Sequence, residues 1–193
     1  MVDKLEKEIL ITGFGGQGII LSGDILGKAA TLYDDKQATM TQSYGPEARG
    51  GSCSSQVMIG EEEILFPYVE NPRLLICMSQ EGYAKNVEKL IENGTLLWDS
   101  DLVKTGEHNP SWNTYHIPAT RFAEEMGNKM MANIVMLGFV SAVSDVVTVD
   151  ALRKAVLTSV PPHTKDKNAA AFDRGREYGE AILKSKAKQD GSR

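Results

Sequence analysis

Cysteine is scarce in this 193-residue sequence, which contains only Cys53 and Cys77. Two isolated cysteines do not support a disulfide framework, so we expect each to be a small buried residue of a strand. A cubane iron–sulfur cluster requires about four thiolates, more than this chain can supply. The three histidines form no H-x-x-x-H pair. We therefore expect no metal site on this chain.

An excess of basic residues and a long apolar run are also absent. The formal net charge is −5 at pH 7, and no basic stripe is interleaved with aromatics, which argues against a nucleic-acid-binding protein. The longest apolar stretch covers residues 130–143, short of the roughly 20 residues that a membrane span requires, and predicts a buried helix. The charged start MVDKLEKE does not resemble a secretory signal. We expect a cytoplasmic protein that binds neither nucleic acid nor membrane.

Short apolar strands alternate with amphipathic helices through most of the sequence, which is typical of an α/β fold. We expect a single domain (residues 1–193, core about 8–183) with a mostly parallel sheet flanked by helices, a Rossmann-like first β–α unit and a frayed C-terminal tail. Ser79 is expected to cap a helix that ends at Gly94. Expected strands are 8–12, 37–43, 52–60, 73–79, 95–100 and 114–120, with a further short strand before Pro67; expected helices are 19–32, 80–94, 121–127, 129–145, 149–160 and 165–186.

The first strand ends in a glycine turn, ILITGFGGQGIIL, in which three glycines fit the spacing G-x-G-x-x-G. Such a turn permits positive φ, lets a ligand approach the backbone and directs helix N–H groups outward, so it suits an anion. Three interpretations remain open: a dinucleotide site, a site for another phosphate-bearing or acyl ligand or for a partner chain, and a purely structural turn. The residues concerned are Gly13, Gly15, Gly16, Gln17 and Gly18. The Gln17 amide can meet a ligand or bond the local backbone.

The acidic half of a dinucleotide fingerprint is in the wrong place. Asp34 and Asp35 stand about 20 positions beyond the turn, but they precede the second expected strand. A ribose-binding carboxylate belongs at the end of that strand, where Gln42 and Ser43 are neutral. The sequence therefore disfavours a free-standing dinucleotide-binding oxidoreductase, which is kept as an alternative.

A second unusual stretch, TQSYGPEARGGSCSS, follows the second expected strand. Arg49 presents a fork that matches a carboxylate or phosphate, and the alternative is a surface loop with a solvated pair between Glu47 and Arg49. We expect the two strands to be neighbours, so that the turn and this loop form one surface at the carboxyl edge of the sheet. The candidate binding or partner-facing residues of the loop are Ser43, Tyr44, Gly45, Pro46, Glu47, Arg49, Gly50 and Gly51.

Together, GFGGQGI, QSYGPEARGGS and the later NAAAFDRGREYG resemble the γ subunit, or γ domain, of the 2-oxoacid:ferredoxin oxidoreductases. The resemblance covers about residues 8–183. It implies an enzyme that oxidatively decarboxylates a 2-oxoacid, transfers the acyl group to coenzyme A (CoA) and passes electrons to ferredoxin. SYGPEARGG is more similar to the 2-oxoglutarate and branched-chain members than to the pyruvate members, and we predict 2-oxoglutarate.

The same resemblance implies a division of labour among chains. Thiamine diphosphate, Mg²⁺ and iron–sulfur clusters would lie on partner chains of the α, β and δ types, and this chain would carry no catalytic residue and no activity alone. Its role would be docking and a contribution to the CoA path. A non-catalytic structural subunit is the second alternative. An isolated chain with an apolar docking surface can also self-associate when partners are missing.

Overall fold

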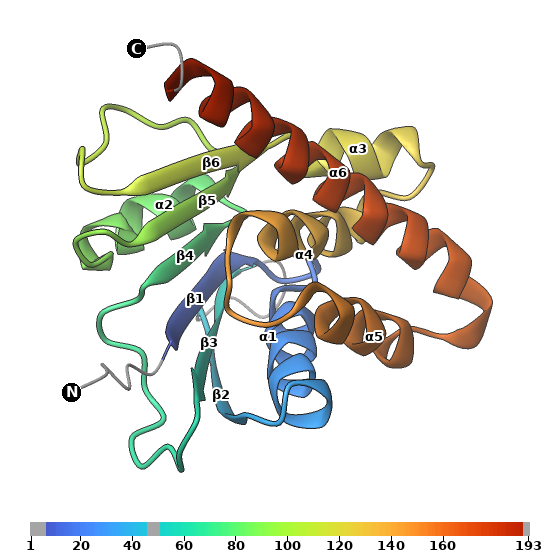
Figure 1. The fold of residues 1–193 in the computed structure, drawn as a ribbon, viewed down its shortest axis with the longest axis horizontal. Helices are drawn as coiled ribbons and strands as arrows, with labels where there is room; N and C mark the ends of the chain where they lie inside the picture. The colour runs from blue at the N-terminus through green and yellow to red at the C-terminus, as the bar shows by residue number, and fades with distance from the viewer. Residues whose placement is uncertain (1–6, 46–50, 191–193) are drawn as a thin grey trace.

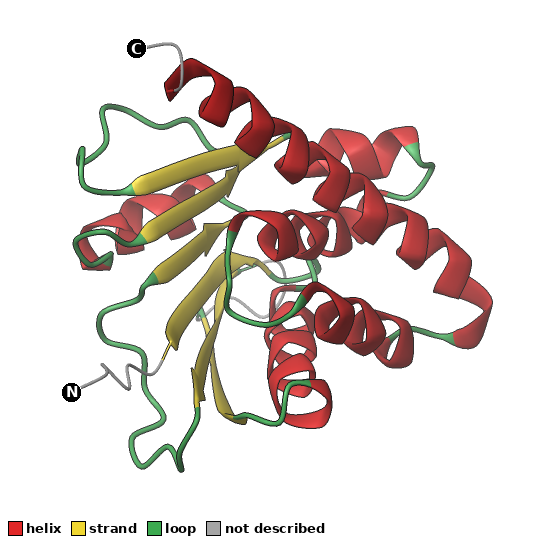
Figure 2. Cartoon of the chain, viewed as in Figure 1, coloured by secondary structure: helices red, strands yellow, loops and turns green. Residues whose placement is uncertain are grey.

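The computed structural model describes residues 7–45 and 51–190. Five helices cover one face of a twisted sheet and one short helix covers the other, giving three layers (Figures 1 and 2). The strands are β1 (Lys7–Phe14), β2 (Gln37–Tyr44), β3 (Ser52–Gly60), β4 (Leu74–Cys77), β5 (Thr95–Asp99) and β6 (Asn113–Ile117). The helices are α1 (Ile19–Lys28), α2 (Gln80–Asn86), α3 (Ala119–Glu125), α4 (Ala132–Val143), α5 (Val149–Ser159) and α6 (Lys165–Asp190).

The six strands lie in the order β2-β3-β1-β4-β5-β6. β1, β4, β5 and β6 are mutually parallel, whereas β3 is antiparallel to both of its neighbours, β1 and β2. β2 therefore points the same way as β1, so five strands share one direction and the sheet is mixed. The predicted α/β class and mostly parallel sheet are confirmed. The sequence led us to expect β1 and β2 to be neighbours. This expectation was wrong, because β3 lies between them.

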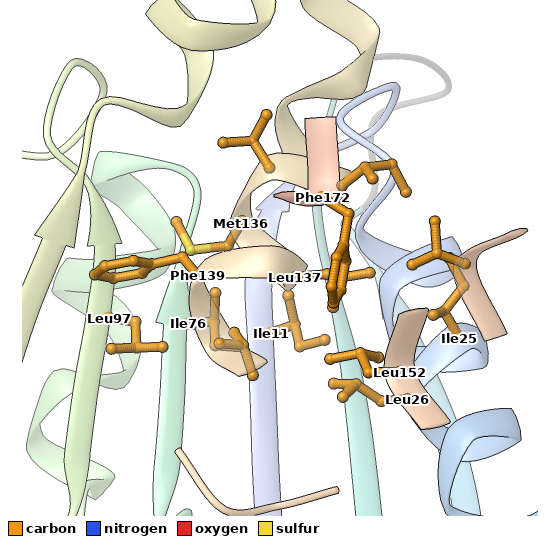
Figure 3. Packing of buried hydrophobic residues seen from close by; sticks show 14 of the residues in the cluster. Ile11, Ile25, Leu26, Ile76, Leu97, Met136, Leu137, Phe139, Leu152 and Phe172 are labelled. Carbon is orange, nitrogen blue, oxygen red and sulfur yellow. The ribbon is translucent and has the colours of Figure 1, made fainter. Parts of the chain in front are cut away.

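The main core lies between the sheet and the large helical layer (Figure 3). α4 is buried almost all round because α6 covers the side that faces away from the sheet; a helix enclosed in this way is apolar on every face. This explains the apolar stretch over residues 132–143, whereas Met130, in the 3₁₀ turn before α4, is 64% exposed and departs from the expected buried helix. Ile11 and Ile76 of the sheet, Leu137 of α4 and Phe172 of α6 meet in this layer (Figure 3).

Two glycines allow α4 and α6 to touch backbone to backbone. A Cβ atom at Gly138 of α4 would overlap the carbonyl oxygen of Phe172, and one at Gly175 of α6 would overlap that of Val135. Backbone atoms are not able to move aside as a flexible side chain does, so these positions exclude any larger residue. The first glycine of the motif NAAAFDRGREYG, Gly175, is therefore explained by helix packing.

A smaller cluster lies on the opposite face, beneath α2. Its base is formed by side chains of three adjacent strands: Leu10 of β1, Leu75 of β4, and Leu96 and Trp98 of β5. As predicted, the Ser79 hydroxyl caps α2 by accepting a hydrogen bond from the Gly82 amide at 3.1 Å. Both cysteines are buried strand residues with free thiols, as expected.

Several segments differ from the sequence-based expectation. The strand expected at 114–120 ends at Ile117, and Ala119 and Thr120 already belong to α3. Residues 61–70 contain no strand, and α2 with its 3₁₀ extension ends at Lys89 rather than at Gly94. Around the end of the 61–70 segment, the amides of Val69, Glu70 and Asn71 donate to side chains rather than to a neighbouring strand. α6 continues to Asp190, through much of the segment expected to be frayed. Across the described part of the chain, every helix is too short or too polar to cross a membrane.

Candidate functional site

The glycine turn connects the end of β1 to the start of α1. Gly16 has φ of 95° and Gly18 has φ of 72°, conformations that glycine adopts without strain. Gly18 caps α1 without a side-chain hydrogen bond, so the positive end of the helix has no side-chain cap. A Cβ atom at Gly18 would also overlap the amide of Asn133, a buried residue of α4. The turn is therefore held tightly against the helical layer.

Gln17 fixes the turn from inside. Its Oε1 atom accepts a hydrogen bond from the Phe14 amide at 2.6 Å, and its Nε2 atom donates to the Met78 carbonyl at 2.9 Å. Both ends of the side-chain amide are thus occupied by backbone, one on β1 and one beyond β4. In the structure the Gln17 amide therefore bonds to backbone, with one partner close in sequence, Phe14, and one distant partner, Met78.

The segment after β2 meets the glycine turn directly. The Gly15 amide donates to the Gly51 carbonyl at 2.9 Å, and the Gly45 amide donates to the Ser52 carbonyl at 2.6 Å. Pairing of β3 with both β1 and β2 causes this meeting, because Ser52 lies opposite Phe14 and Cys53 lies opposite Tyr44. The two stretches do share the carboxyl edge of the sheet, although their strands are separated by β3.

The structure brings most of the candidate residues to this edge. Ser43 and Tyr44 are exposed at the end of β2, and the Tyr44 hydroxyl donates to Gln42 Oε1 at 3.1 Å. Four candidates, Pro46, Glu47, Arg49 and Gly50, lie outside the described residues.

Beside these residues lies a hollow of about 190 Å³ between α2 and the strands. Its floor carries the hydroxyls of Thr12 of β1, Ser43 of β2, and Ser52 and Ser54 of β3. A phosphate-sized group fits this volume, whereas a whole nucleotide cofactor does not.

Two lysines of the α2 segment line the same hollow. Lys89 donates to Asn86 Oδ1 at 3.0 Å, while Lys85 forms no ion pair within residues 7–45 and 51–190. Glu81 is the acidic member of the lining. Hydroxyl and ammonium donors around one cavity favour an anionic ligand.

Cys53 also lines the hollow. Burial raises the pKa of the Cys53 thiol, so it is neutral at physiological pH. Burial raises the pKa of Cys77 to about 12. Neither thiol has the thiolate character that a nucleophile or a metal ligand needs.

Sequence reasoning missed Lys85, Lys89 and Asn133. The two lysines share a helix face because they are four residues apart, but their segment was interpreted only as an amphipathic helix. Asn133 is 3% exposed; its Nδ2 atom donates to the Gly18 carbonyl at 3.4 Å, and its Oδ1 atom lacks a partner in the described part of the chain. An amide inside an otherwise apolar helix was the available signal.

The geometry also weakens the dinucleotide interpretation. In the dinucleotide-binding fold the ribose carboxylate ends the strand next to the first strand, yet here β3 occupies that place. Asp34 lies elsewhere: its carboxylate accepts hydrogen bonds from the Thr148 amide at 2.6 Å and the Thr148 hydroxyl at 2.5 Å. Asp34 thereby fastens the start of α5 to the segment before β2.

These features define an α/β domain with an anion-suited hollow and a rigid glycine turn at the carboxyl edge of its sheet. A family model described as pyruvate ferredoxin/flavodoxin oxidoreductase matches residues 8–178, and the chain belongs to this family. The resemblance carried by GFGGQGI and QSYGPEARGGS is confirmed.

Relatives of the chain are oxidoreductase subunits. It is 48% identical over 181 residues to 2-oxoglutarate synthase subunit KorC of Methanocaldococcus jannaschii, covering 93% of this chain and 97% of that one. The γ subunit of a keto/oxoacid ferredoxin oxidoreductase from Geobacter sulfurreducens PCA has a TM-score of 0.80 at 40% identity, covering 91% of this chain and 99% of that one.

A longer chain contains the same fold. The 2-oxoglutarate:ferredoxin oxidoreductase from Magnetococcus marinus, solved with 2-oxoglutarate, coenzyme A and succinyl-CoA bound, has a TM-score of 0.82 at 22% identity. The match covers 93% of this chain but 32% of that one. The fold therefore occurs both as a separate subunit and as about a third of a larger polypeptide.

Proposed function

We propose that this chain is the γ subunit of a multi-chain 2-oxoacid:ferredoxin oxidoreductase that acts on 2-oxoglutarate, and that its carboxyl edge contributes to the CoA path. The observation that carries the proposal is the hydrogen bond from Gly15 to Gly51, which joins the two family motifs beside the hollow. The high identity to a 2-oxoglutarate synthase subunit supports the choice of substrate.

CoA is a strongly anionic molecule that carries a diphosphate and a further phosphate. The ammonium of Lys85, which has no ion-pair partner among the described residues, the hydroxyls of the strand floor and the start of α1 all suit such groups. The hollow is large enough for one phosphate, so the rest of CoA would lie along the surface or against a partner chain. Arg49, between the motif glycines, is the further cation proposed for this contact.

The chemistry itself is assigned to partner chains of the α, β and δ types. Thiamine diphosphate, Mg²⁺ and the iron–sulfur clusters would be bound there, with ferredoxin as the electron acceptor and the complex in the cytoplasm. The two buried, neutral thiols of this chain are consistent with that division. The role proposed for this chain is to bind, orient and shield, while the cofactors supply the reaction.

Recovery of the complex tests the assignment. The tagged chain is purified without oxygen from its own cells and analysed by native mass spectrometry, and the product is assayed with 2-oxoacids and CoA. We expect larger chains that carry thiamine diphosphate and iron–sulfur clusters, with 2-oxoglutarate as the preferred substrate. Recovery of the chain alone with a bound dinucleotide would contradict the proposal.

Substitution tests the CoA contact in the assembled enzyme. Lys85→Ala should raise the KM for CoA about three- to tenfold, the effect of losing a partly screened charged contact. Arg49→Ala should also raise the KM for CoA, or weaken assembly, because loss of a charge-assisted contact costs about 1.5–3 kcal/mol of binding free energy. Lys154→Ala, at an exposed position of α5, is the matched control. Equal KM values for all variants would remove this edge from the CoA path.

A further inference from the structure

Three large apolar side chains project from the segment between β3 and β4. Leu65 is 86% exposed, Phe66 is 54% exposed and Tyr68 is 55% exposed. We call Leu65, Phe66 and Tyr68 the apolar knob. Single exposed apolar residues are ordinary, but three large ones within four positions are a concentration of the kind that marks a protein contact.

The segment is held in place by hydrogen bonds to the sheet. The Glu8 carboxylate accepts from the amides of Glu70 and Asn71, each at 3.0 Å, and Gln56 Oε1 accepts from the Val69 amide at 2.9 Å. Phe66 and Tyr68 pack edge to face with ring centroids 5.5 Å apart. The chain is thus anchored directly after the knob and the two rings support each other, which reduces the conformational entropy lost when the knob is covered.

Acidic residues flank the knob on both sides. Glu63 precedes it and Glu70 follows it; Glu61, further from the knob, pairs with Lys36 at 4.0 Å. A contact between two copies of this chain centred on the knob would bring both acidic groups together, because a two-fold interface places the same patch on each side. Like charges across an interface are unfavourable. The charge pattern therefore favours a different chain, with an apolar socket rimmed by basic residues.

The lengths of the relatives indicate which partner chain binds the apolar knob. In the Magnetococcus marinus protein the same fold is about a third of one polypeptide, so its contact with the remaining part is made within one chain. The present chain matches 97% of the length of the KorC subunit, so that subunit has no covalent link of that kind to the matching partner. A subunit of this kind would have to bind that partner through surface contacts alone. We propose that the apolar knob is the docking element for the subunit that corresponds to the remainder of that longer chain, an inference that rests on the proposed function.

The experiment compares assembly of variants with the partner subunits from the same organism. The triple variant Leu65→Ser, Phe66→Ser, Tyr68→Ser removes only exposed side chains, so its thermal unfolding should match that of the native chain. Its dissociation constant from the partner subunits should rise roughly 30-fold or more, as on loss of an aromatic hot spot. Leu32→Ser, at a position 64% exposed in the π-helical segment Ala29–Tyr33 that follows α1, is the control and should leave assembly unchanged.

Hydrogen exchange supplies a second readout. On assembly of the native chain, the amides of Ile64, Leu65, Phe66 and Tyr68 should become protected. Weaker binding at higher salt should reveal the basic rim of the socket. Equal assembly of the native chain and the triple variant would overturn the docking proposal alone. Knob-dependent self-association with unchanged assembly would overturn it in favour of a second copy. Failure of the native chain to assemble at all would overturn the proposed function as well.

Discussion

The side-chain amide of Gln17 reaches from the glycine turn to the backbone beyond β4, where its Nε2 atom donates to the Met78 carbonyl oxygen at 2.9 Å. The same amide holds the Phe14 N–H. A residue inside a glycine-rich motif therefore serves as a brace between two strands of the sheet. The geometry of the proposed CoA edge depends on this brace.

Gln17→Ala should lower the free energy of unfolding by about 1–3 kcal/mol, because two hydrogen bonds are lost and the Phe14 and Met78 backbone groups lose a partner. Urea unfolding of the isolated chain measures this. In the assembled enzyme, the same variant should also raise the KM for CoA, since the turn loses its brace.

Gln80→Ala is the matched control for that variant. The Gln80 amide also forms two backbone hydrogen bonds, donating to the Lys104 carbonyl at 3.1 Å and accepting from the Lys104 amide at 2.7 Å. The Gln80→Ala variant should lower the free energy of unfolding without changing the KM for CoA. If Gln17→Ala also leaves that KM unchanged, the turn is purely structural.

Gly175→Ala should destabilise the fold by about 3 kcal/mol or more, because the new methyl group would overlap the Val135 carbonyl oxygen of α4. Gly27→Ala is the control on α1, where an added Cβ atom meets nothing within 4 Å. That variant should be stabilising by up to about 1 kcal/mol, since alanine favours a helix more than glycine does. Thermal unfolding of both variants checks the pair, and similar melting temperatures would contradict the packing argument.

Asp34→Ala should lower the free energy of unfolding by about 1–3 kcal/mol through loss of its two hydrogen bonds to Thr148. It should leave the affinity for CoA unchanged, because this carboxylate serves α5 rather than a ligand. Asp35→Asn, at a neighbouring exposed position with φ of 53°, keeps a residue type that tolerates this conformation and serves as the control. Binding of a dinucleotide that depends on Asp34 would contradict this assignment.

The ion pair between Asp173 and Arg153 should make stability depend on pH. Arg153 donates to both carboxylate oxygens, at 3.0 and 2.9 Å, and this hydrogen bonding lowers the pKa of Asp173. A folded-state pKa below the unfolded value of about 3.9 contributes stability that is present above that pH and is lost as the pH falls through the folded pKa.

Asp173→Asn should therefore reduce stability at pH 7, and the difference from the native chain should vanish at acid pH once Asp173 is protonated in the folded state. The side chains of Arg153 and Asp173 are 37% and 40% exposed, so solvent screening limits the effect to about 1 kcal/mol or less. Urea unfolding at several pH values measures it. Glu177→Gln on the same helix is the control, and a difference that persists at low pH would exclude titration of Asp173 as the cause.

Local signals predicted most of the elements. Ser79 was correctly identified as a cap because an N-cap acts within one helical turn, and the alternation of apolar strands and helices fixed the α/β class. The antiparallel direction of β3 was not predictable in the same way. Strand direction depends on how the chain returns to the sheet, and the expectation that β1 and β2 are neighbours was wrong for that reason.

Tertiary placement also decided the residues that were missed. The apolar residues around Pro67 predicted a strand, yet here they are exposed because the segment has no neighbouring strand to pair with. Lys85 and Lys89 looked like an ordinary solvated helix face, and only the position of α2 over the hydroxyl-bearing strands gives them a shared cavity. Arg49, the strongest single candidate from the sequence, lies outside the described residues, so its role stays a prediction.

Gln56 belongs to two surfaces at once, since it lines the hollow and its Oε1 atom holds the Val69 amide at the end of the knob segment. Val69 itself lines the hollow. Any shift of this segment on docking would therefore move one wall of the cavity. Thermodynamic reciprocity then applies: whatever factor the partner subunit imposes on CoA affinity, CoA imposes on the affinity for that subunit. The change in CoA affinity on assembly and the change in subunit affinity on CoA binding would then measure the same coupling free energy.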